Sequence, residues 1–347
     1  MHRPTPRSGN AAPHELAPLV GPALMLAALL LFNLLCTPGF ADVAVRDGRA
    51  SGALIDILQN GAPIVLIAVG MTLVIALGGI DLSVGSVMAL SGCVAALLVS
   101  EQGCPFALAL PLALLVGLAA GAVNGALAAF LGLQPIVATL ILLVGLRGAA
   151  QTLTADQKIR FHDPAFLGLA DAHVLGLPLP VLIAGGVALG VWVMLRVTPL
   201  GTAVAAAGDS PDAARRCGVR TRSLAVACYA GCGACAAIAG LLAAADIREG
   251  DPAAGLAVEL DAILAVVIGG TRLTGGRPRV LGSVMGALVM QTLTVTLLMR
   301  NVTPEHALAI KAAVALSVCL LQTPRAELLF GRVRARPVRR ALGAGAP

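Results

Sequence analysis

The sequence predicts an all-α integral membrane protein with about ten transmembrane helices, some of them broken near the middle of the bilayer. Of the 347 residues, 58% are hydrophobic and only 12% are charged, whereas soluble domains are about 45–50% apolar and about 25% charged. The apolar residues gather in runs close to the ~20 residues that a helix needs to cross a bilayer. A Gly-Gly pair followed by a polar turn interrupts two of these runs, which predicts helices that stop inside the membrane.

The first apolar run covers residues 17–36 and follows a polar segment, 1–16, that we interpret as a cytoplasmic tail. Gly39-Phe40-Ala41 resembles a signal-peptidase site, but the run exceeds the ~7–15 residues of a signal-peptide core, which favours an uncleaved first span. We interpret 17–323 as a single transmembrane domain and 324–347 as a basic tail. The other predicted spans are 61–79, 84–100, 106–131, 136–153, 179–197, 223–245, 261–271, 281–299 and 307–323; the short run at 261–271 predicts a half-helix or a tilted piece.

Arginine placement gives these spans a predicted orientation. Arginines cluster in the loops 198–222 and 272–280 and in the C-terminal tail. The positive-inside rule therefore places these stretches and both termini in the cytoplasm, which ten alternating spans satisfy. The segments 37–60, 154–178 and 246–260 then face outward.

A short stretch between the second and third spans predicts a break in a membrane helix. Gly78 and Gly79 are expected to end one helix, because glycine readily takes the left-handed conformation that terminates helices. Asp81 and Ser83 offer oxygens that cap the free N–H groups of the next helix. Asp81 is also the only carboxylate between Asp56 and Glu101. An ionisable group in such a place marks either a solute path or a structural lock.

A second stretch resembles this break. Residues 66–92 and 263–290 both read as an apolar run, Gly-Gly, a polar turn and then Gly-Ser-Val-Met, with Gly269 and Gly270 as the second pair. Broken helices at matching places in two halves indicate a transport path. The alternative is chance similarity between two Ala/Val/Gly-rich segments.

Several polar side chains lie inside predicted spans and are candidates to line a solute path. Arg147 and Gln151 are four residues apart and so share a helix face. The alternative for Asn124 and the small hydroxyls is a bond between helices, worth ~0.6 kcal/mol. A charge needs water or a partner, which favours the path for Asp81 and Arg147 unless the two neutralise each other. The candidates are Thr72, Asp81, Ser83, Asn124, Arg147, Gln151 and Gln291.

Glycines in the fourth span predict close helix packing. Gly117, Gly121 and Gly125 follow one another at intervals of four, which leaves one helix face without side chains. Cys228, Cys232 and Cys235 are spaced like metal ligands, but the Ala/Gly-rich helix around them contains no histidine. We therefore interpret the cysteines as small packing residues and expect no metal.

The loop 198–222 predicts two short helices on the cytoplasmic side. Ser210 or Asp209 is expected to cap the second, with Pro211 at its first position and Gly218 at its end. A short helix of small residues is suited to docking a soluble partner; the alternative is a plain connection. The candidate coupling residues are Gly201, Thr202, Gly208, Asp209, Ala213, Ala214 and Gly218.

Other features limit the function. The chain has no Gly-rich loop ending in Gly-Lys, so any ATP must be bound by a partner. All five histidines lie outside the predicted spans, which argues against an enzyme within the membrane. Aromatic residues make up only 3%, which favours a conduit that holds a hydrophilic solute weakly.

Residues 78–85 together with 201–218 resemble the sugar-importing ABC permeases of the ribose, xylose and galactoside group, over about residues 50 to 325. Three stretches, 134–142, 244–248 and 259–270, with Gly275-Gly276-Arg277, are similar to the galactofuranose-type permease. The sequence departs from the family at 291–296 and at Asp209-Ser210, which leaves the exact sugar open.

The resemblance implies the membrane subunit of an importer in the bacterial inner membrane that moves a monosaccharide from periplasm to cytoplasm. Galactofuranose or a related pentose or hexose is the expected cargo. The implied partners are a cytoplasmic ATPase, a periplasmic sugar-binding protein, a second permease subunit in a heterodimer, and membrane lipid. No cofactor of its own, no enzymatic activity and no nucleic acid are expected. The alternative function is an ion-coupled secondary transporter with Asp81 and Arg147 as its coupling pair.

Overall fold

The computed structural model describes residues 19–321 except 38, 43, 47–48 and 175. The predicted tails 1–16 and 324–347, with their arginines, lie outside the described residues. The chain forms two units, 1–303 and 304–347. The second unit contributes one described helix, α13 (Pro304–Leu321).

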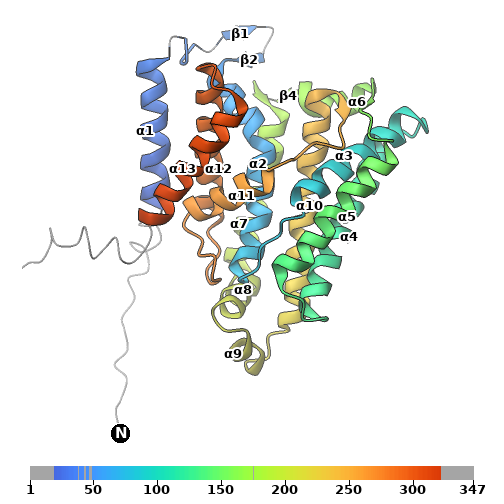
Figure 1. Cartoon of the computed structure of the whole chain (residues 1–347), viewed down its shortest axis with the longest axis vertical. Coiled ribbons are helices and arrows are strands. Elements are labelled where there is room, and N and C mark those ends of the chain that lie inside the picture. The colour runs from blue at the N-terminus through green and yellow to red at the C-terminus, as the bar shows by residue number, and fades with distance from the viewer. Residues whose placement is uncertain (1–18, 38, 43, 47–48, 175, 322–347) are drawn as a thin grey trace, which may run out of the picture. The chain divides into compact units, whose positions relative to one another are not determined.

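The first unit is built from helices joined by short loops and three small two-stranded sheets (Figure 1). Its helices are α1 (Val20–Cys36), α2 (Ala53–Ala76), α3 (Val84–Ser100), α4 (Phe106–Ala129), α5 (Pro135–Leu153), α6 (Pro164–Asp171), α7 (Leu179–Val197), α8 (Pro199–Asp209), α9 (Pro211–Arg216), α10 (Thr221–Ile247), α11 (Val258–Ile268) and α12 (Val280–Met299). Its strands are β1 (Ala44–Arg46), β2 (Arg49–Ser51), β3 (Ile159–Arg160), β4 (His173–Val174), β5 (Leu177–Pro178) and β6 (Glu249–Gly250).

The chain is a polytopic helical membrane protein, as predicted. Among the described residues, six helices are long and apolar enough to cross a membrane, and α1 and α3 are shorter apolar helices. The short run at 261–271 is a half-helix: α11 has 11 residues, about 16 Å, against a hydrocarbon core of about 30 Å.

The predicted start of the second span was wrong. The helix α2 begins at Ala53 and ends at Ala76 rather than covering 61–79. The beginning of α2 contains Gln59 and Asn60. Because these polar residues lower the local hydropathy, the predicted span starts only after them. The predicted outward segment 37–60 therefore includes the beginning of a long helix.

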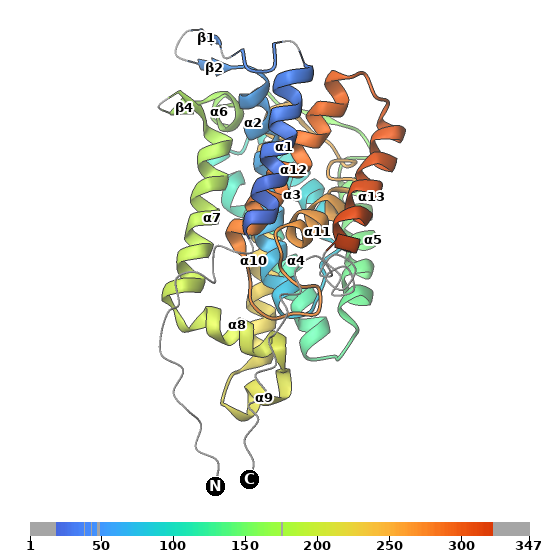
Figure 2. The same cartoon turned by 90° about the vertical axis from the view of Figure 1, so that its left-hand side faces the viewer.

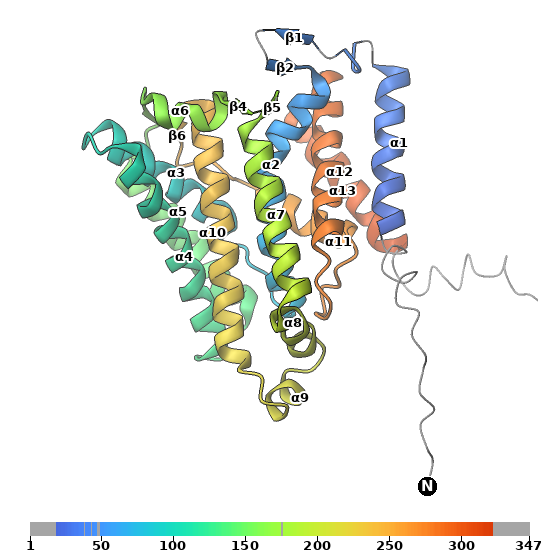
Figure 3. The same ribbon diagram turned by 180° about the vertical axis from the view of Figure 1, so that it is seen from behind.

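The core of the first unit forms where α10 packs against α4, α2 and α3 (Figure 3). The predicted glycine face of α4 makes this close approach possible. A Cβ at Gly117 would overlap the carbonyl oxygen of Gly233, and one at Gly121 would overlap that of Tyr229. At Gly125 a Cβ would lie 2.6 Å from the Cα of Val226. Small residues in α4 therefore bring two membrane helices into backbone contact.

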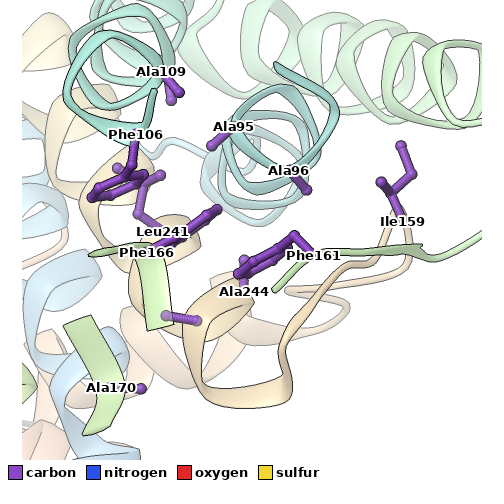
Figure 4. Packing of buried hydrophobic residues seen from close by; sticks show 12 residues of the cluster. Ala95, Ala96, Phe106, Ala109, Ile159, Phe161, Phe166, Ala170, Leu241 and Ala244 are labelled. Atoms are coloured by element: carbon purple, nitrogen blue, oxygen red, sulfur yellow. The ribbon is translucent and has the colours of Figure 1, made fainter. Parts of the chain in front are cut away.

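A cluster of aromatic rings fixes the segment 154–178 onto this core (Figure 4). Phe166 of α6 is fully buried, and its ring stacks on Phe161 at a centroid distance of 4.1 Å and on Phe106 of α4 at 4.6 Å. Leu241 and Ala244 of α10 pack against the same rings. The few aromatic residues of this chain thus hold a connecting segment against two membrane helices.

Segments that the arginine pattern assigned to the same side lie at the same end of the first unit. The strand β3 from segment 154–178 pairs with β6 from segment 246–260, and β2 contacts β5. At the other end, α7 leads into α8 and α9 (Figure 2), and the N–H of Gly276 donates to the carbonyl of Ala76 at 2.9 Å, beside Gly208 of α8. The loops 198–222 and 272–280 therefore meet at the end of α2.

Candidate functional site

The break after α2 forms as the Gly-Gly pair predicts. Gly78 has φ +78°, in the left-handed region. Its N–H donates to the carbonyl of Ile75 at 2.9 Å, and the N–H of Gly79 donates to Val74 at 3.1 Å. This pair of bonds is the Schellman ending, which satisfies the last carbonyls of a helix. Gly79 is also required by packing, because a Cβ there would overlap the hydroxyl of Tyr229.

The second Gly-Gly pair ends α11 in the same way. Gly270 has φ +84° and its N–H donates to Val267 at 2.9 Å. The N–H of Thr271 donates to Val266 at 3.2 Å. The preceding Gly269 lies directly against Gly282 of α12. The two breaks therefore share one kind of helix ending, although different helices pack against them.

Asp81 lies at the centre of a buried hydrogen-bond cluster with Ser83 and Asn124. Its side chain is 1% exposed. Its Oδ1 accepts from the Ser83 N–H at 2.9 Å, the Ser83 hydroxyl at 2.7 Å and the Asn124 amide at 3.3 Å. The same amide donates to Ser83 Oγ at 2.7 Å. We call these three residues the joint cluster; it ties the break between α2 and α3 to α4.

The capping differs in detail from the prediction. Asp81 accepts the N–H of Ser83, the residue just before the first turn of α3, through a local Asx-type bond. Ser83 makes no side-chain cap, since its hydroxyl donates to Asp81 instead. The start of α5 also reaches this break, where the Thr139 hydroxyl donates to the carbonyl of Ile80 at 3.3 Å. The carboxylate thus organises the turn itself as well as the helix that follows.

Arg147 lies elsewhere and has partners of its own. Its guanidinium donates to the carbonyls of Pro252 at 2.7 Å and Ala254 at 2.6 Å, in the turn that precedes α11. Asp81 and Arg147 therefore do not satisfy each other, because each is bound to a different set of groups. Gln151, predicted on the same face as Arg147, is exposed.

The turn that Arg147 holds, residues 251–257, is also fixed on two other sides. Gly255 has φ +70°, and a Cβ there would lie 2.7 Å from the carbonyl oxygen of Gly85 at the start of α3. Lys158 forms an ion pair with Asp251 at 3.0 Å. Burial alone would raise the pKa of Asp251, but the hydrogen bonds from Lys158 and from the Ala253 N–H, with the nearby positive charges, lower it below its ordinary value. The carboxylate is therefore ionised at neutral pH.

Thr72 and Gln291 lie at the interface between α2 and α12. The Thr72 hydroxyl donates to the Ala68 carbonyl at 2.6 Å, and its oxygen lies 2.7 Å from Ser283 Oγ. Gln291 is 6% exposed and its Cγ would lie 3.3 Å from a Cβ at Gly61. The structure thus brings together Asp81, Ser83 and Asn124 from the candidate path set, and places Thr72, Arg147, Gln151 and Gln291 apart from them.

The predicted pair of short helices forms in the loop 198–222. The Ser210 hydroxyl accepts from the Ala213 N–H at 3.4 Å, so Ser210 rather than Asp209 caps α9, with Pro211 at its first position. Gly218, with φ +87°, ends α9 in another Schellman pair. These local signals gave the correct helix boundaries.

The candidate coupling residues divide between an inner and an outer face. Ala214 is 3% exposed and packs with Leu73 and Ala76 of α2. A Cβ at Gly208 would overlap the carbonyl of Ala76, and one at Gly201 would overlap that of Leu195. The outer face, exposed at this end of the unit, carries Thr202, Asp209, Ala213 and Gly218.

No role at the break was predicted for Tyr229, whereas Cys232, predicted to be a packing residue, is buried as expected. Tyr229 of α10 lies against Gly79, and Cys232 lies next to Gly70 of α2. With Cys228 and Cys235, these side chains fill the space where α10 meets α2. A lone tyrosine in an apolar run carries no signal of its partner, because the partner is far away in the sequence.

Comparison with known proteins gives a family and several relatives. The family model described as "Branched-chain amino acid transport system / permease component" matches residues 53–319. The galactofuranose transporter permease protein YtfT of Escherichia coli (strain K12) is 46% identical over 90% of this chain and 91% of its own length. The fructose import permease protein FruF of Bifidobacterium longum is 37% identical over 89% of each chain. The ribose import permease protein RbsC of Escherichia coli (strain K12) is 39% identical over 78% of this chain and 86% of its own. No solved structure matches.

Proposed function

Because the chain belongs to the family described as the permease component of branched-chain amino acid transport systems, and its relatives are sugar permeases, we propose that it moves a monosaccharide across the membrane. It does so as the permease subunit of an ATP-binding-cassette importer. The observation that carries this function is the 46% identity to a galactofuranose permease across nine-tenths of both chains. Galactofuranose, or a related pentose or hexose, is the proposed cargo.

The proposed importer needs other subunits. The sequence contains no Gly-rich loop ending in Gly-Lys, so ATP is bound and hydrolysed by a cytoplasmic partner. A periplasmic sugar-binding protein delivers the cargo, and a second permease chain completes a heterodimer in the inner membrane. The chain crosses this membrane ten times and has both termini in the cytoplasm, as the arginine-rich loops indicate.

The end of α2 offers a route by which an ATPase acts on the membrane helices. Gly208 of α8 contacts the carbonyl of Ala76 in the last turn of α2, and Gly276 donates to the same carbonyl at 2.9 Å. The break at Gly78 and the joint cluster follow immediately. A movement of α8 and α9 is therefore transmitted through backbone contacts to the start of α3, and we assign the outer face of these two helices to the ATPase.

The opposite end of the pathway is closed by the turn 251–257 in this proposal. The side chain of Arg147 binds two of its carbonyls and Gly255 packs on Gly85. The contact of Gly255 reaches the break region, since Gly85 lies in the first turn of α3. Opening toward the outside then requires this turn to leave α3 and Arg147.

The cargo is tested by uptake of labelled methyl galactofuranoside, ribose and fructose into cells that contain the complete importer. A strain without the permease gene is the control. We expect uptake of the galactofuranoside to depend on this chain. Ribose or fructose uptake that depends on the chain, with none of the galactofuranoside, would assign it another sugar. If the strain without the permease gene takes up all three sugars at the wild-type rate, the result would contradict the sugar function.

A further inference from the structure

A cavity of about 250 Å³ lies between α2, α10, α7, α3 and α11, at the end of the first unit that carries β3 and β6. In this region Figure 3 shows α2 partly behind α7, with α10 to the left of both. The walls are mostly apolar and include Pro63, Pro180 and Leu242. Ligand pockets for drug-sized molecules are about 300–1,000 Å³, so this cavity suits a smaller ligand.

Three polar side chains line this otherwise apolar cavity, and two of them, Asn60 and Asp246, are exposed. Gln59 and Asn60 come from the first turns of α2, and Asp246 comes from the last turn of α10. The Gln59 amide donates to Asp246 Oδ1 at 3.4 Å, near the long limit of a hydrogen bond. Two amides and one carboxylate supply both donors and acceptors. Neighbouring hydroxyl groups of a sugar need that combination, since each hydroxyl donates one hydrogen bond and accepts others.

We propose that this cavity is a low-affinity binding site for the transported monosaccharide, held within a single permease subunit. The proposal rests on the sugar-importer function given above. Asp246 and Gln59 bind vicinal hydroxyls in place of their long mutual bond, and the apolar walls contact the C–H face of the ring. No aromatic ring lines the cavity among its described residues, so binding is weak and release toward the cytoplasm is not hindered.

The floor of the cavity connects this site to the turn 251–257. Val258, the first residue of α11, lines it together with Met88 of α3. The Met88 sulfur would lie 3.1 Å from a Cβ at Gly255. Met88 therefore contacts the same turn that Arg147 binds. A sugar in the cavity therefore presses on the element whose displacement opens the pathway.

The first test replaces the polar groups with close analogues. Gln59→Leu removes the amide, and Asp246→Asn removes the charge while keeping the shape. Asp156→Asn is the matched control, because Asp156 is exposed at the same end and outside the cavity. With saturating binding protein and ATP, we expect about tenfold slower uptake for the first two variants, and normal uptake for the control. Equal recovery of the assembled complex shows that folding is unaffected.

The second test detects the sugar directly. Ala243 lines the cavity, so a cysteine is placed there by Ala243→Cys after the eight native cysteines are replaced. Its alkylation in membranes is followed with increasing methyl galactofuranoside, ribose or fructose, and Gln157→Cys serves as the exposed control. We expect the transported sugar to slow alkylation at position 243 at millimolar concentration, with no effect at position 157.

The outcomes separate this site from the general function. Normal uptake by both cavity variants, or alkylation that no sugar slows, overturns the binding site while wild-type uptake still supports the importer. If removal of lipid changes the alkylation rate but no sugar does, a lipid headgroup occupies the cavity, and the proposed sugar site is overturned. A wild-type complex that takes up no sugar contradicts the proposed function itself.

Discussion

Asp81 is the residue around which the break between α2 and α3 forms. A carboxylate that is 1% exposed is stable only if hydrogen bonds replace the water that it has lost. Three such bonds reach a single oxygen, from Ser83 and Asn124. The donors come from the turn itself and from α4, so the carboxylate holds two segments that the sequence separates.

We expect Asp81→Asn and Asp81→Ala to differ. Asparagine keeps an acceptor oxygen for the Ser83 N–H, so the variant should assemble and retain most transport. Alanine leaves buried donors unpaired at a cost of roughly 1–3 kcal/mol each, so the complex should be recovered poorly. Thermal unfolding of the purified complex and sugar uptake measure the two effects. Asp56→Asn, at an exposed position of α2, is the control.

The charge itself is essential for transport if both Asp81 variants assemble normally yet transport poorly. That result would move Asp81 from a structural role to the solute path. Normal transport by Asp81→Ala would contradict both roles, and with them the importance of the joint cluster.

Arg147 is predicted to hold the turn 251–257 in place. Hydrogen bonds from charged groups contribute about 1.5–3 kcal/mol, and Arg147 makes two of them to this turn. Arg147→Gln should therefore speed amide hydrogen exchange in 251–257 and slow sugar uptake. Arg160→Gln is the control, since its ion pair with Glu249 is exposed on the arginine side and such pairs contribute only about 0–1 kcal/mol. Unchanged exchange in Arg147→Gln would show that Gly255 and Lys158 suffice to fix the turn.

At the scale of elements, α8 and α9 present one face to α2 and the other to the outside. Ala213 and Ala214 are adjacent on α9, yet Ala213 is exposed and Ala214 is 3% exposed. This difference gives a matched pair for testing ATPase docking. Gly208 does not serve this purpose, because any side chain there disrupts the contact with Ala76.

We expect Ala213→Glu to assemble in the membrane but to lose at least about tenfold of sugar-stimulated ATP hydrolysis. A new charge in a docking surface must be desolvated without a partner, which costs about 2–5 kcal/mol. Ala214→Glu should instead reduce the amount of folded protein, since it buries a charge against α2. Full ATP hydrolysis by Ala213→Glu would place the ATPase elsewhere.

The elements that the sequence predicted correctly are those with local causes. Gly78, Gly270 and Gly218 take the positive φ values that end their helices, and Ser210 caps the helix that starts at Pro211. These outcomes depend on a few neighbouring residues, so the pattern alone was sufficient.

The candidate site was predicted only in part, because its contacts are made over long range. Asn124 was a candidate for the solute path, with a bond between helices as the alternative; it binds the break, but nothing in the sequence pairs it with Asp81. The partners of Arg147 are backbone carbonyls, which every residue carries. The Gln59–Asp246 contact was hidden because hydropathy placed Gln59 outside a helix.

At the scale of the whole molecule, α2 connects the two ends of the first unit. Its 24 residues extend for about 36 Å. Gln59 lines the cavity at one end, and Ala76 contacts α8 at the other. A single continuous helix therefore links the proposed sugar site with the proposed ATPase contact.

The orientation of this helix is tested by labelling single cysteines from outside intact cells. Gln157 and Arg216 are exposed at opposite ends of the first unit, so Gln157→Cys should react and Arg216→Cys should react only after the membrane is opened. Asp163 is less suitable, because its side chain caps α6 at Phe166. The reverse pattern of labelling would overturn the predicted orientation.

The energy source of transport tests the central claim most directly. The chain is reconstituted in liposomes with the ATPase, the second permease and the sugar-binding protein, and labelled sugar is supplied with binding protein on one side and ATP on the other. We predict uptake that requires ATP hydrolysis and the binding protein and that is indifferent to Na⁺ and H⁺ gradients. Uptake by this chain alone, driven by an ion gradient and abolished by Asp81→Asn, would contradict the account and establish a secondary transporter.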